Sequence, residues 1–299
     1  MEKEKIKVYF TDFWPNFVHS DNYFYHLLSK KYKVVISNNN PDILFFSVDY
    51  SNKKEHLKFS NTSTKKIFYT GENLEPDYNY CDAAFSFNPL NTEKNYRLPL
   101  WVLFLNWFQV PYKKNRDQSY LLNIEKLILQ NKSLKTNKKF CSFVASKPVG
   151  KRMEFFEKLN KREEVNSAGR LFNNSKRIKG RGDQKWKIKY LKKFKFNLAI
   201  ENSSSPGYVT EKIIHSMYAN SIPIYWGAED IGKDFNTESF ININNYKSDE
   251  DAIEDIIDIY SDKDRYMDKL NQPWFVNNSI PSQFQPNKIL NFIESVLNN

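Results

Sequence analysis

Two adjacent charged residues in the second half of the chain, Glu211 and Lys212, have the chemistry of a phosphate site. Both stand in the first turn of an expected helix, where unpaired backbone N–H groups and the positive end of the helix dipole attract anions. A lysine there adds a point charge for phosphate oxygens, and a glutamate can accept hydrogen bonds from hydroxyl groups. Two ordinary surface charges are the alternative, but a lysine at a helix start is slightly unfavourable unless an anion is bound.

The surrounding segment predicts the elements that must position this pair. Residues 197–228 read NLAIENSSSPGYVTEKIIHSMYANSIPIYWGA, which is typical of a strand, a loop rich in serine, an amphipathic helix and a second strand. We place the strands at Phe196–Ile200 and Ile222–Trp226 and the helix at Thr210–Tyr218. Ligands of open α/β sheets bind outside the carboxyl ends of the strands, so we expect the chemistry in the loops that follow these strands.

Apolar runs elsewhere in the chain predict more short strands, buried on both faces of parallel sheets. The polar stretch Gln130–Lys139, QNKSLKTNKK, has the composition of a linker between two domains. A chain of 299 residues is long enough for two domains that each bury a core. The other expected strands are Ile6–Phe10, Ile43–Val48, Lys66–Tyr69, Ala83–Phe87 and Phe140–Ala145, and the other expected helices are Tyr23–Leu28, Lys151–Leu159, Asp249–Tyr260 and Lys288–Leu297.

The composition is that of a globular protein with a basic balance. Hydrophobic residues make up 40% and charged residues 27%, and the formal net charge is +10. This charge favours nucleic acid, an anionic membrane or a phosphate-bearing substrate, without choosing among them. Cys81 and Cys141 show neither a zinc spacing nor a disulfide framework, which fits a reducing compartment. The apolar stretch Ile6–Phe10 is too short for a signal sequence or a membrane span, so we expect a cytoplasmic protein.

Three segments form a recognisable series along the chain. They read YTGENLEPDYN from Tyr69, ASKPVGKRMEFFEKLN from Ala145, and ENSSSPGYVTEK from Glu201 with IPIYWGA from Ile222. Through these segments, which cover roughly residues 67–228, the chain resembles the bacterial-type α1,3/4-fucosyltransferases of the two-domain glycosyltransferase (GT-B) architecture.

The resemblance implies an α/β fold with two Rossmann-like α/β/α domains that face each other across a cleft. We expect an acceptor-binding domain over residues 1–137 and a GDP-fucose-binding domain over residues 138–275. A C-terminal helix within residues 276–299 is expected to pack back toward the first domain. Closure of the two domains over the donor would exclude water that could otherwise hydrolyse it.

The resemblance also implies roles for individual residues. Glu72 would be the general base that takes the proton from the acceptor hydroxyl, with Glu211 as a second catalytic carboxylate beside the donor sugar. Displacement with inversion needs a carboxylate opposite the leaving group, and negative charge near the ring stabilises an oxocarbenium-like transition state. Arg152 and Lys212 would neutralise the charge that departing GDP gains. The residues expected to bind the donor are Arg152, Asn202, Tyr208, Glu211 and Lys212.

The implied reaction is inverting transfer of L-fucose from GDP-fucose to a GlcNAc hydroxyl, with O3 in N-acetyllactosamine-type glycans as the expected position. Such a reaction occurs in the synthesis of Lewis-type glycans or of the lipopolysaccharide O-antigen. We expect no prosthetic group and no essential metal, because side-chain cations would hold the diphosphate. The expected partners are GDP-fucose, an oligosaccharide acceptor with GlcNAc and, weakly, an anionic membrane at its cytoplasmic face. The acceptor, the linkage and the oligomeric state stay open.

Alternatives exist for the function as a whole. Another nucleotide-sugar transferase of the same architecture could use a different donor or acceptor, and an inactive relative could only bind glycan. A nucleic-acid-binding module would explain the charge, but no RRM, KH, zinc-finger or helix-turn-helix pattern accompanies it. The basic run Lys176–Lys195 is either a solvated face or an attractor for phosphate or an anionic membrane.

Alternatives also exist for individual residues. Glu72 could be a solvated turn carboxylate, and a one-residue slip would exchange Arg152 with Lys151. Asn202 and Tyr208 could serve only to shape their loop.

Two acidic triplets, residues 249–251 and 262–264, are of a kind that binds metal in other, single-domain glycosyltransferases. Ser248 with Asp251 is typical of a helix cap, so we expect no metal there. His215 is expected to be a surface or packing residue.

Overall fold

The chain divides into two compact units. The structure, a computed structural model, describes residues 3–48, 52–111, 121–128, 138–176 and 184–298. Contacts group Met1–Ser119 with Ser282–Asn299 in one unit and place Tyr120–Pro281 in the other.

This division differs from the expected boundaries after residues 137 and 275. Helix α3 (Ile124–Ile128) belongs to the second unit because it contacts helix α6 (Glu211–Tyr218). The Asn278 amide of the same unit donates a hydrogen bond of 2.9 Å to the Ile128 carbonyl. The expected linker lies almost entirely in residues 129–137, outside the described residues.

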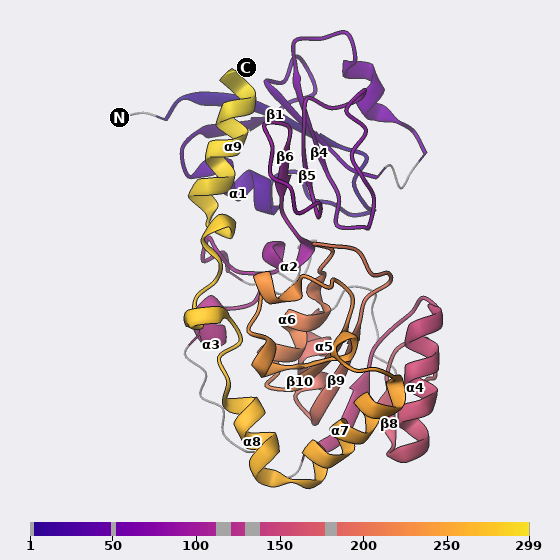
Figure 1. The fold of residues 1–299 in the computed structure, drawn as a ribbon. Helices are drawn as coiled ribbons and strands as arrows, with labels where there is room; N and C mark the ends of the chain where they lie inside the picture. Colours follow the sequence, from indigo (N-terminus) through magenta and orange to yellow (C-terminus); the bar gives the residue numbers. More distant parts are fainter. Residues whose placement is uncertain (1–2, 49–51, 112–120, 129–137, 177–183, 299) are drawn as a thin grey trace. The chain divides into compact units, whose positions relative to one another are not determined.

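The first unit is built on a six-stranded parallel sheet with the order β2-β1-β3-β4-β5-β6 (Figure 1). All the expected strands of this half are confirmed. The two edge strands, β2 and β6, were not expected, because the apolar run in KVVI is only three residues long and NYR is short and polar. The strands are β1 (Lys5–Thr11), β2 (Lys33–Ile36), β3 (Ile43–Phe46), β4 (Lys65–Tyr69), β5 (Ala83–Ser86) and β6 (Asn95–Arg97).

The last helix of the chain belongs to this first unit. In helix α9 (Pro286–Asn298) the Phe292 ring lies against Phe85 of the sheet, with 5.2 Å between the ring centroids. The Tyr32 hydroxyl donates a hydrogen bond of 2.9 Å to the Glu294 carboxylate. The other helical elements of the unit are α1 (Tyr23–Ser29), η1 (Glu55–Phe59), α2 (Leu100–Leu103) and η6 (Ser282–Phe284).

The second unit contains a five-stranded parallel sheet with the order β11-β10-β9-β7-β8. Its central strand β9 pairs with β10 on one side and β7 on the other, and most of its side chains are buried. The carboxyl ends of β9 and β10 therefore lie side by side, which brings together the loops that follow them. The strands are β7 (Lys139–Phe143), β8 (Val165–Ser167), β9 (Phe194–Ile200), β10 (Ile222–Trp226) and β11 (Ile241–Asn242).

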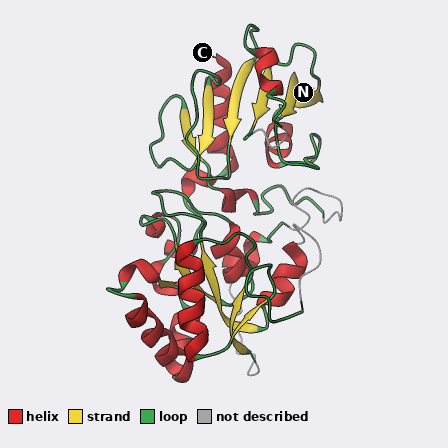
Figure 2. Ribbon diagram, turned by 90° about the vertical axis from the view of Figure 1, so that its right-hand side faces the viewer, coloured by secondary structure: helices red, strands yellow, loops and turns green. Residues whose placement is uncertain are grey.

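Helices flank this sheet on both sides (Figure 2). Helix α6 begins at Glu211, and its apolar stripe packs on β9 and β10 as its sequence predicts. The expected cap of α7 is confirmed, since the Ser248 hydroxyl accepts a hydrogen bond of 3.1 Å from the Asp251 N–H. The remaining helices are α4 (Gly150–Arg162), α5 (Gln184–Leu191), α7 (Asp249–Ser261) and α8 (Lys263–Asn271), with the short η2 (Ile231–Lys233), η3 (Thr237–Ser239), η4 (Ile243–Asn245) and η5 (Val276–Asn278).

Candidate functional site

A buried carboxylate organises the loop between β9 and α6. Glu201 directly follows β9 and is 0% exposed. Its oxygens accept hydrogen bonds from the Thr210 N–H (2.8 Å), the Thr210 hydroxyl (2.7 Å) and Lys212 Nζ (2.7 Å). These bonds close residues 201–210 into a fixed loop and hold Lys212 at the start of α6.

The start of α6 has the features of an anion site. Thr210 precedes the helix, but its side chain bonds Glu201 and makes no capping bond to the helix N–H groups. Unpaired N–H groups at a helix start and a lysine beside them attract phosphate oxygens. Burial lowers the pKa of Lys212, yet the charges of Glu201 and Glu211 outweigh it and raise that pKa, so the lysine carries its charge at neutral pH.

Arg152 joins this site from helix α4. Its side chain is 2% exposed and donates 2.8 Å hydrogen bonds to the Lys147 carbonyl, the Ile200 carbonyl and the Asn202 amide oxygen. A guanidinium has five N–H donors, so one on Nη1 and the one on Nε remain after these bonds. The neighbouring Lys151 instead pairs with Asp249 of α7. This geometry favours Arg152 over Lys151 as the residue of the site.

Glu211 is held between two lysines. Lys187 Nζ of helix α5 lies 3.3 Å from Glu211 Oε1, with side-chain exposures of 15% and 19%. Burial raises the pKa of Glu211, but the charges of Lys187 and Lys212 outweigh it and bring that pKa well below the ordinary value. Glu211 is therefore ionised at neutral pH. It can accept hydrogen bonds and stabilise positive charge, and it is not a proton donor there.

The cluster as a whole carries excess positive charge. Arg152, Lys187 and Lys212 supply three basic side chains against the two carboxylates Glu201 and Glu211. Burial lowers the pKa of Lys187, and the charge of Glu211 opposes that shift. Such an arrangement fits a ligand with negative charge, and the charged groups are partly shielded from water, which strengthens their interactions.

The serine-rich loop is tied to the end of β10. The Ser204 hydroxyl donates to the Gly227 carbonyl (2.7 Å), and the Gly207 N–H donates to the Asp230 carboxylate (2.7 Å). Gly207 has a φ of 75°, a conformation that favours glycine. Tyr208, which follows it, is 2% exposed, so its ring belongs to the packing of this loop.

Glu72 lies in the first unit, in the loop that follows β4. Its N–H donates to the Thr70 hydroxyl (3.0 Å), its carbonyl accepts from the Leu74 N–H (2.9 Å), and its side chain is half-buried. The carboxyl end of a parallel strand is where ligands of α/β sheets bind. The structure thus places Arg152, Asn202, Tyr208, Glu211 and Lys212 around one loop of the second unit and Glu72 in the other unit.

Two members of the cluster were not singled out from the sequence. Glu201 begins the ENSSSPGYVTEK segment and reads as an ordinary residue after a strand, although its burial makes it the counter-charge of Lys212. Lys187 was included only in the basic run Lys176–Lys195, of which residues 177–183 lie outside the described residues. The helical spacing of α5, with buried Ile188 and Leu191, was the signal that one lysine of this run faces inward.

The acidic triplets and His215 also have defined surroundings in the structure. Within the described residues, no group of three or more His, Cys, Asp or Glu side chains could hold a metal ion. Asp249 pairs with lysines, and Asp262 accepts the N–H groups of Asp264 and Arg265 at the start of α8. His215 is buried in α6, and burial together with the charge of Lys187 lowers its pKa well below the ordinary value, so the packing alternative holds.

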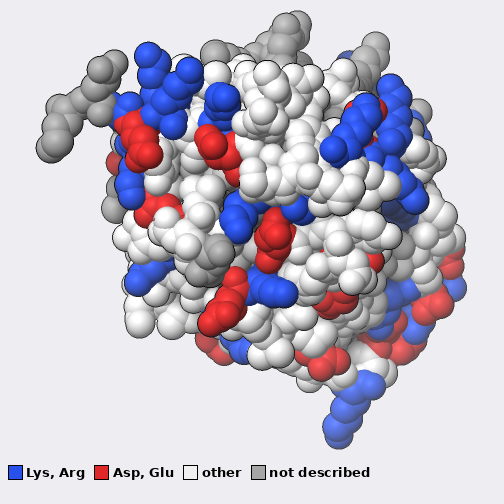
Figure 3. Space-filling model, turned by 90° about the horizontal axis from the view of Figure 1, so that it is seen from above, with Lys and Arg blue, Asp and Glu red and all other residues white. Residues whose placement is uncertain are grey.

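The distribution of surface charge and the lengths of the helices concern two alternatives, binding to nucleic acid and contact with a membrane. On the face shown in Figure 3, acidic side chains lie among the groups of lysines and arginines, so this face is not a uniform basic patch. None of the helices in the described residues combines the length and apolar composition needed to cross a membrane.

Comparison with known proteins identifies relatives over nearly the whole chain. Residues 8–104 match the family profile of the alpha-(1,3)-fucosyltransferase FucT N-terminal domain. Residues 133–284, more than half of the chain, match the C-terminal profile of glycosyltransferase family 10 (fucosyltransferase). The alpha-(1,3)-fucosyltransferase FucT of Helicobacter pylori is 32% identical over 92% of this chain, which spans 62% of the length of that relative. A putative fucosyltransferase of Acanthamoeba polyphaga mimivirus is 32% identical over 48% of this chain and 25% of its own length.

Solved structures extend the similarity to three dimensions. A crystal structure of an alpha1,3-fucosyltransferase has a TM-score of 0.80 at 27% identity, covering 99% of this chain and 91% of that chain. The crystal structure of an alpha1,3-fucosyltransferase with GDP-fucose has a TM-score of 0.78 at 27% identity, covering 100% of this chain and 92% of that chain. These matches confirm the expected α/β fold of the GT-B type. The chain belongs to glycosyltransferase family 10, the fucosyltransferases.

Proposed function

We propose that this protein transfers L-fucose from GDP-fucose to a GlcNAc hydroxyl of an oligosaccharide, with inversion, and that O3 in N-acetyllactosamine-type glycans is the position. The observation that carries the proposal is the positively charged cluster at the start of α6, where Lys212 is held by buried Glu201. A site of this kind matches a diphosphate leaving group. The similarity to an alpha1,3-fucosyltransferase with GDP-fucose supports the choice of donor.

The second unit would bind the donor. Lys212 and the two remaining N–H donors of Arg152 would neutralise the charge that develops on GDP as the bond to the sugar breaks. The ionised Glu211 would lie beside the sugar or the ribose, where it can accept hydrogen bonds and stabilise positive charge at the anomeric carbon. Asn202 fixes the guanidinium of Arg152, and Tyr208 packs within the loop that joins Glu201 to the start of α6. These side chains hold the diphosphate without a protein-bound metal.

The first unit would bind the acceptor. In the proposed step, the acceptor oxygen forms a bond to the anomeric carbon, the bond from that carbon to the GDP oxygen breaks, and the hydroxyl proton passes to Glu72. Glu72 is half-buried after β4, so its backbone is fixed by the loop while its side chain remains accessible to an acceptor that arrives from solvent. Such a position suits a general base. We further propose a cytoplasmic location, which the buried free thiols of Cys81 and Cys141 support.

A transfer assay tests the function. Purified protein is given GDP-fucose and N-acetyllactosamine, and GDP release and product mass are followed, with EDTA in one parallel reaction and GDP-mannose replacing the donor in another. We expect a product heavier by one fucose that forms in the presence of EDTA and is not replaced by a mannosylated product. Absence of any response to GDP-fucose would overturn the proposal, and loss of transfer with EDTA would overturn metal independence.

A further inference from the structure

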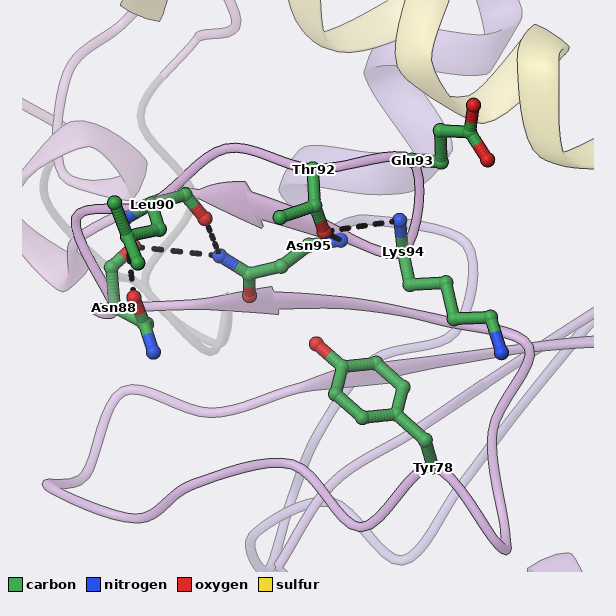
Figure 4. Close-up of a pocket in the computed structure, with 7 residues that line it drawn as sticks. All are labelled: Tyr78, Asn88, Leu90, Thr92, Glu93, Lys94 and Asn95. Atoms are coloured by element: carbon green, nitrogen blue, oxygen red, sulfur yellow. Dashed lines mark hydrogen bonds between the residues drawn. The ribbon is translucent and has the colours of Figure 1, made fainter.

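A pocket in the first unit lies outside the charged cluster described above. It has a volume of about 570 Å³ and is lined by Tyr78, Asn88, Leu90, Thr92, Glu93, Lys94 and Asn95 (Figure 4). The hollow is largely open to solvent, so a ligand would lie along its wall and would not be enclosed. The pocket is formed by the loop that carries Glu72, between β4 and β5, and by the loop between β5 and β6.

The wall of the pocket is held in one conformation by its own hydrogen bonds. Asn95 is 4% exposed, and its amide nitrogen donates to the carbonyls of Leu90 (2.7 Å) and Asn88 (3.3 Å). Its amide oxygen accepts from the Ser86 hydroxyl (2.7 Å). The Thr92 hydroxyl accepts from the Asn95 N–H at 3.0 Å. A wall that is already ordered loses little entropy when a ligand binds.

Apolar side chains gather at the same two loops. Leu74, Tyr78, Tyr80 and Leu90 are 45%, 40%, 48% and 69% exposed, although each has a large apolar surface. The Tyr78 ring points toward the wall formed by Thr92 and Asn95 (Figure 4). Of these four side chains, Tyr78 and Leu90 line the pocket and give it one ring and one aliphatic group that a ligand could cover.

The lining indicates the chemistry of the ligand. It contains an aromatic ring, an aliphatic side chain and one charge of each sign, Lys94 and Glu93, while its amide groups and its threonine hydroxyl already form hydrogen bonds within the two loops. Glu93 points away from the pocket, and no cluster of cations is present in this lining that would hold a phosphate. A tyrosine combines an apolar face with a polar tip, which suits a ring that has an apolar face and hydroxyl edges. A neutral saccharide has both.

The pocket is connected directly to the segment of Glu72. The Asn88 amide donates a hydrogen bond of 3.3 Å to the Glu75 carboxylate. Glu75 is three residues after Glu72, so their Cα atoms are at most about 11 Å apart. The rim of the pocket therefore begins within the length of a short oligosaccharide from Glu72.

We propose that this pocket is a subsite for the neutral sugar units of the acceptor that lie beyond the unit receiving fucose. This inference rests on the proposed function, because the position of Glu72 defines which end of the acceptor reacts. The subsite would make a long acceptor a better substrate than a short one by lowering its KM, without changing the reacting groups.

Kinetics with two acceptor lengths test the subsite. Tyr78→Ala and Leu90→Ala remove pocket contacts, and Leu57→Ala makes the same change at an exposed leucine of η1 outside the pocket. The acceptors are N-acetyllactosamine and a linear trimer of that disaccharide. With the unchanged protein we expect a lower KM for the trimer than for the disaccharide. In each pocket variant the KM for the trimer should rise about fivefold or more, because one ring or aliphatic contact is lost. In both pocket variants, the KM for the disaccharide and the kcat should stay unchanged. In the Leu57→Ala variant, both KM values and the kcat should stay unchanged.

Equal KM values for the two acceptors in the unchanged protein would overturn the subsite, as would an equal rise for both acceptors in the variants. A direct binding measurement separates this inference from the proposed function. Saturation-transfer NMR of the trimer without donor should show contacts with the unchanged protein that weaken in Tyr78→Ala and Leu90→Ala. Absence of those contacts in the unchanged protein would refute the subsite, whether or not fucose is transferred.

Discussion

Replacing Lys187 with methionine tests whether the charge of this lysine contributes to the proposed donor site. Lys187 Nζ lies 3.3 Å from Glu211 Oε1, and the two side chains are mostly shielded from water. Methionine retains much of the apolar stem and removes the charge. A hydrogen bond to a charged group contributes about 1.5–3 kcal/mol. If the transition state depends on this pair, kcat/KM should fall roughly 10- to 150-fold, since each 1.4 kcal/mol is about tenfold.

The same substitution should change the pH dependence in a defined direction. Lys187 and Lys212 hold the pKa of Glu211 below its ordinary value, against the effect of burial. If Glu211 acts as a carboxylate in the reaction, as proposed above, activity is lost as pH falls through its pKa in the folded protein. Without Lys187 that pKa rises, so the acid limb of the rate profile should move to higher pH.

The assay measures kcat and KM for GDP-fucose across the acid range, with two control variants. Lys187→Arg keeps the charge and should keep most of the activity. Lys189→Met makes the same change at an exposed position of α5, where the lysine lies over the Trp186 ring, and should have little effect. Unchanged kinetics and an unchanged acid limb in Lys187→Met would refute this account of the cluster, as would equal losses in the Lys189→Met control.

Three further substitutions give separate expected outcomes. Glu72→Ala should reduce transfer by at least about 100-fold, the contribution of a general base, while calorimetry shows unchanged GDP binding; near-normal turnover would remove the base assignment. Arg152→Ala should weaken GDP binding by about 2 kcal/mol or more. Lys151→Ala breaks only the pair with Asp249 and should leave GDP binding unchanged, so equal effects of the two substitutions would show that the assignment to Arg152 is wrong. Glu201→Gln should lower the free energy of unfolding by about 3 kcal/mol in urea titrations, because it leaves Lys212 without its buried counter-charge; a loss below about 1 kcal/mol would show that the pair contributes little.

The fold was largely predictable because its buried strands are continuous apolar runs. Strands such as Ile43–Phe46 and Phe194–Ile200 are covered on both faces, so hydrophobicity alone marks them. The edge strands β2, β6 and β8 and the two-residue β11 carry no apolar run of that length and were missed. The division by contacts differs from the expected boundary because α3 contacts residues far along the chain, which local composition does not reveal.

The site was predictable in its residue types and less so in its connections. The sequence indicates Glu211 and Lys212 at a helix start, and the structure adds that Glu201 and Lys187 balance them. These partners lie 11 and 24 residues away in sequence, so only the fold pairs them. Whether Tyr208 contacts the donor stays a prediction, and its burial shows that it also packs within the loop.

The anomeric configuration of the transferred sugar tests the central claim most directly. The product of GDP-fucose and N-acetyllactosamine would be purified, weighed by mass spectrometry and analysed by NMR for the position and configuration of the new bond. The account predicts one added fucose on O3 of GlcNAc, with the anomeric configuration opposite to that of the donor. A product with the donor's configuration, or no fucosylated product at all, would contradict it.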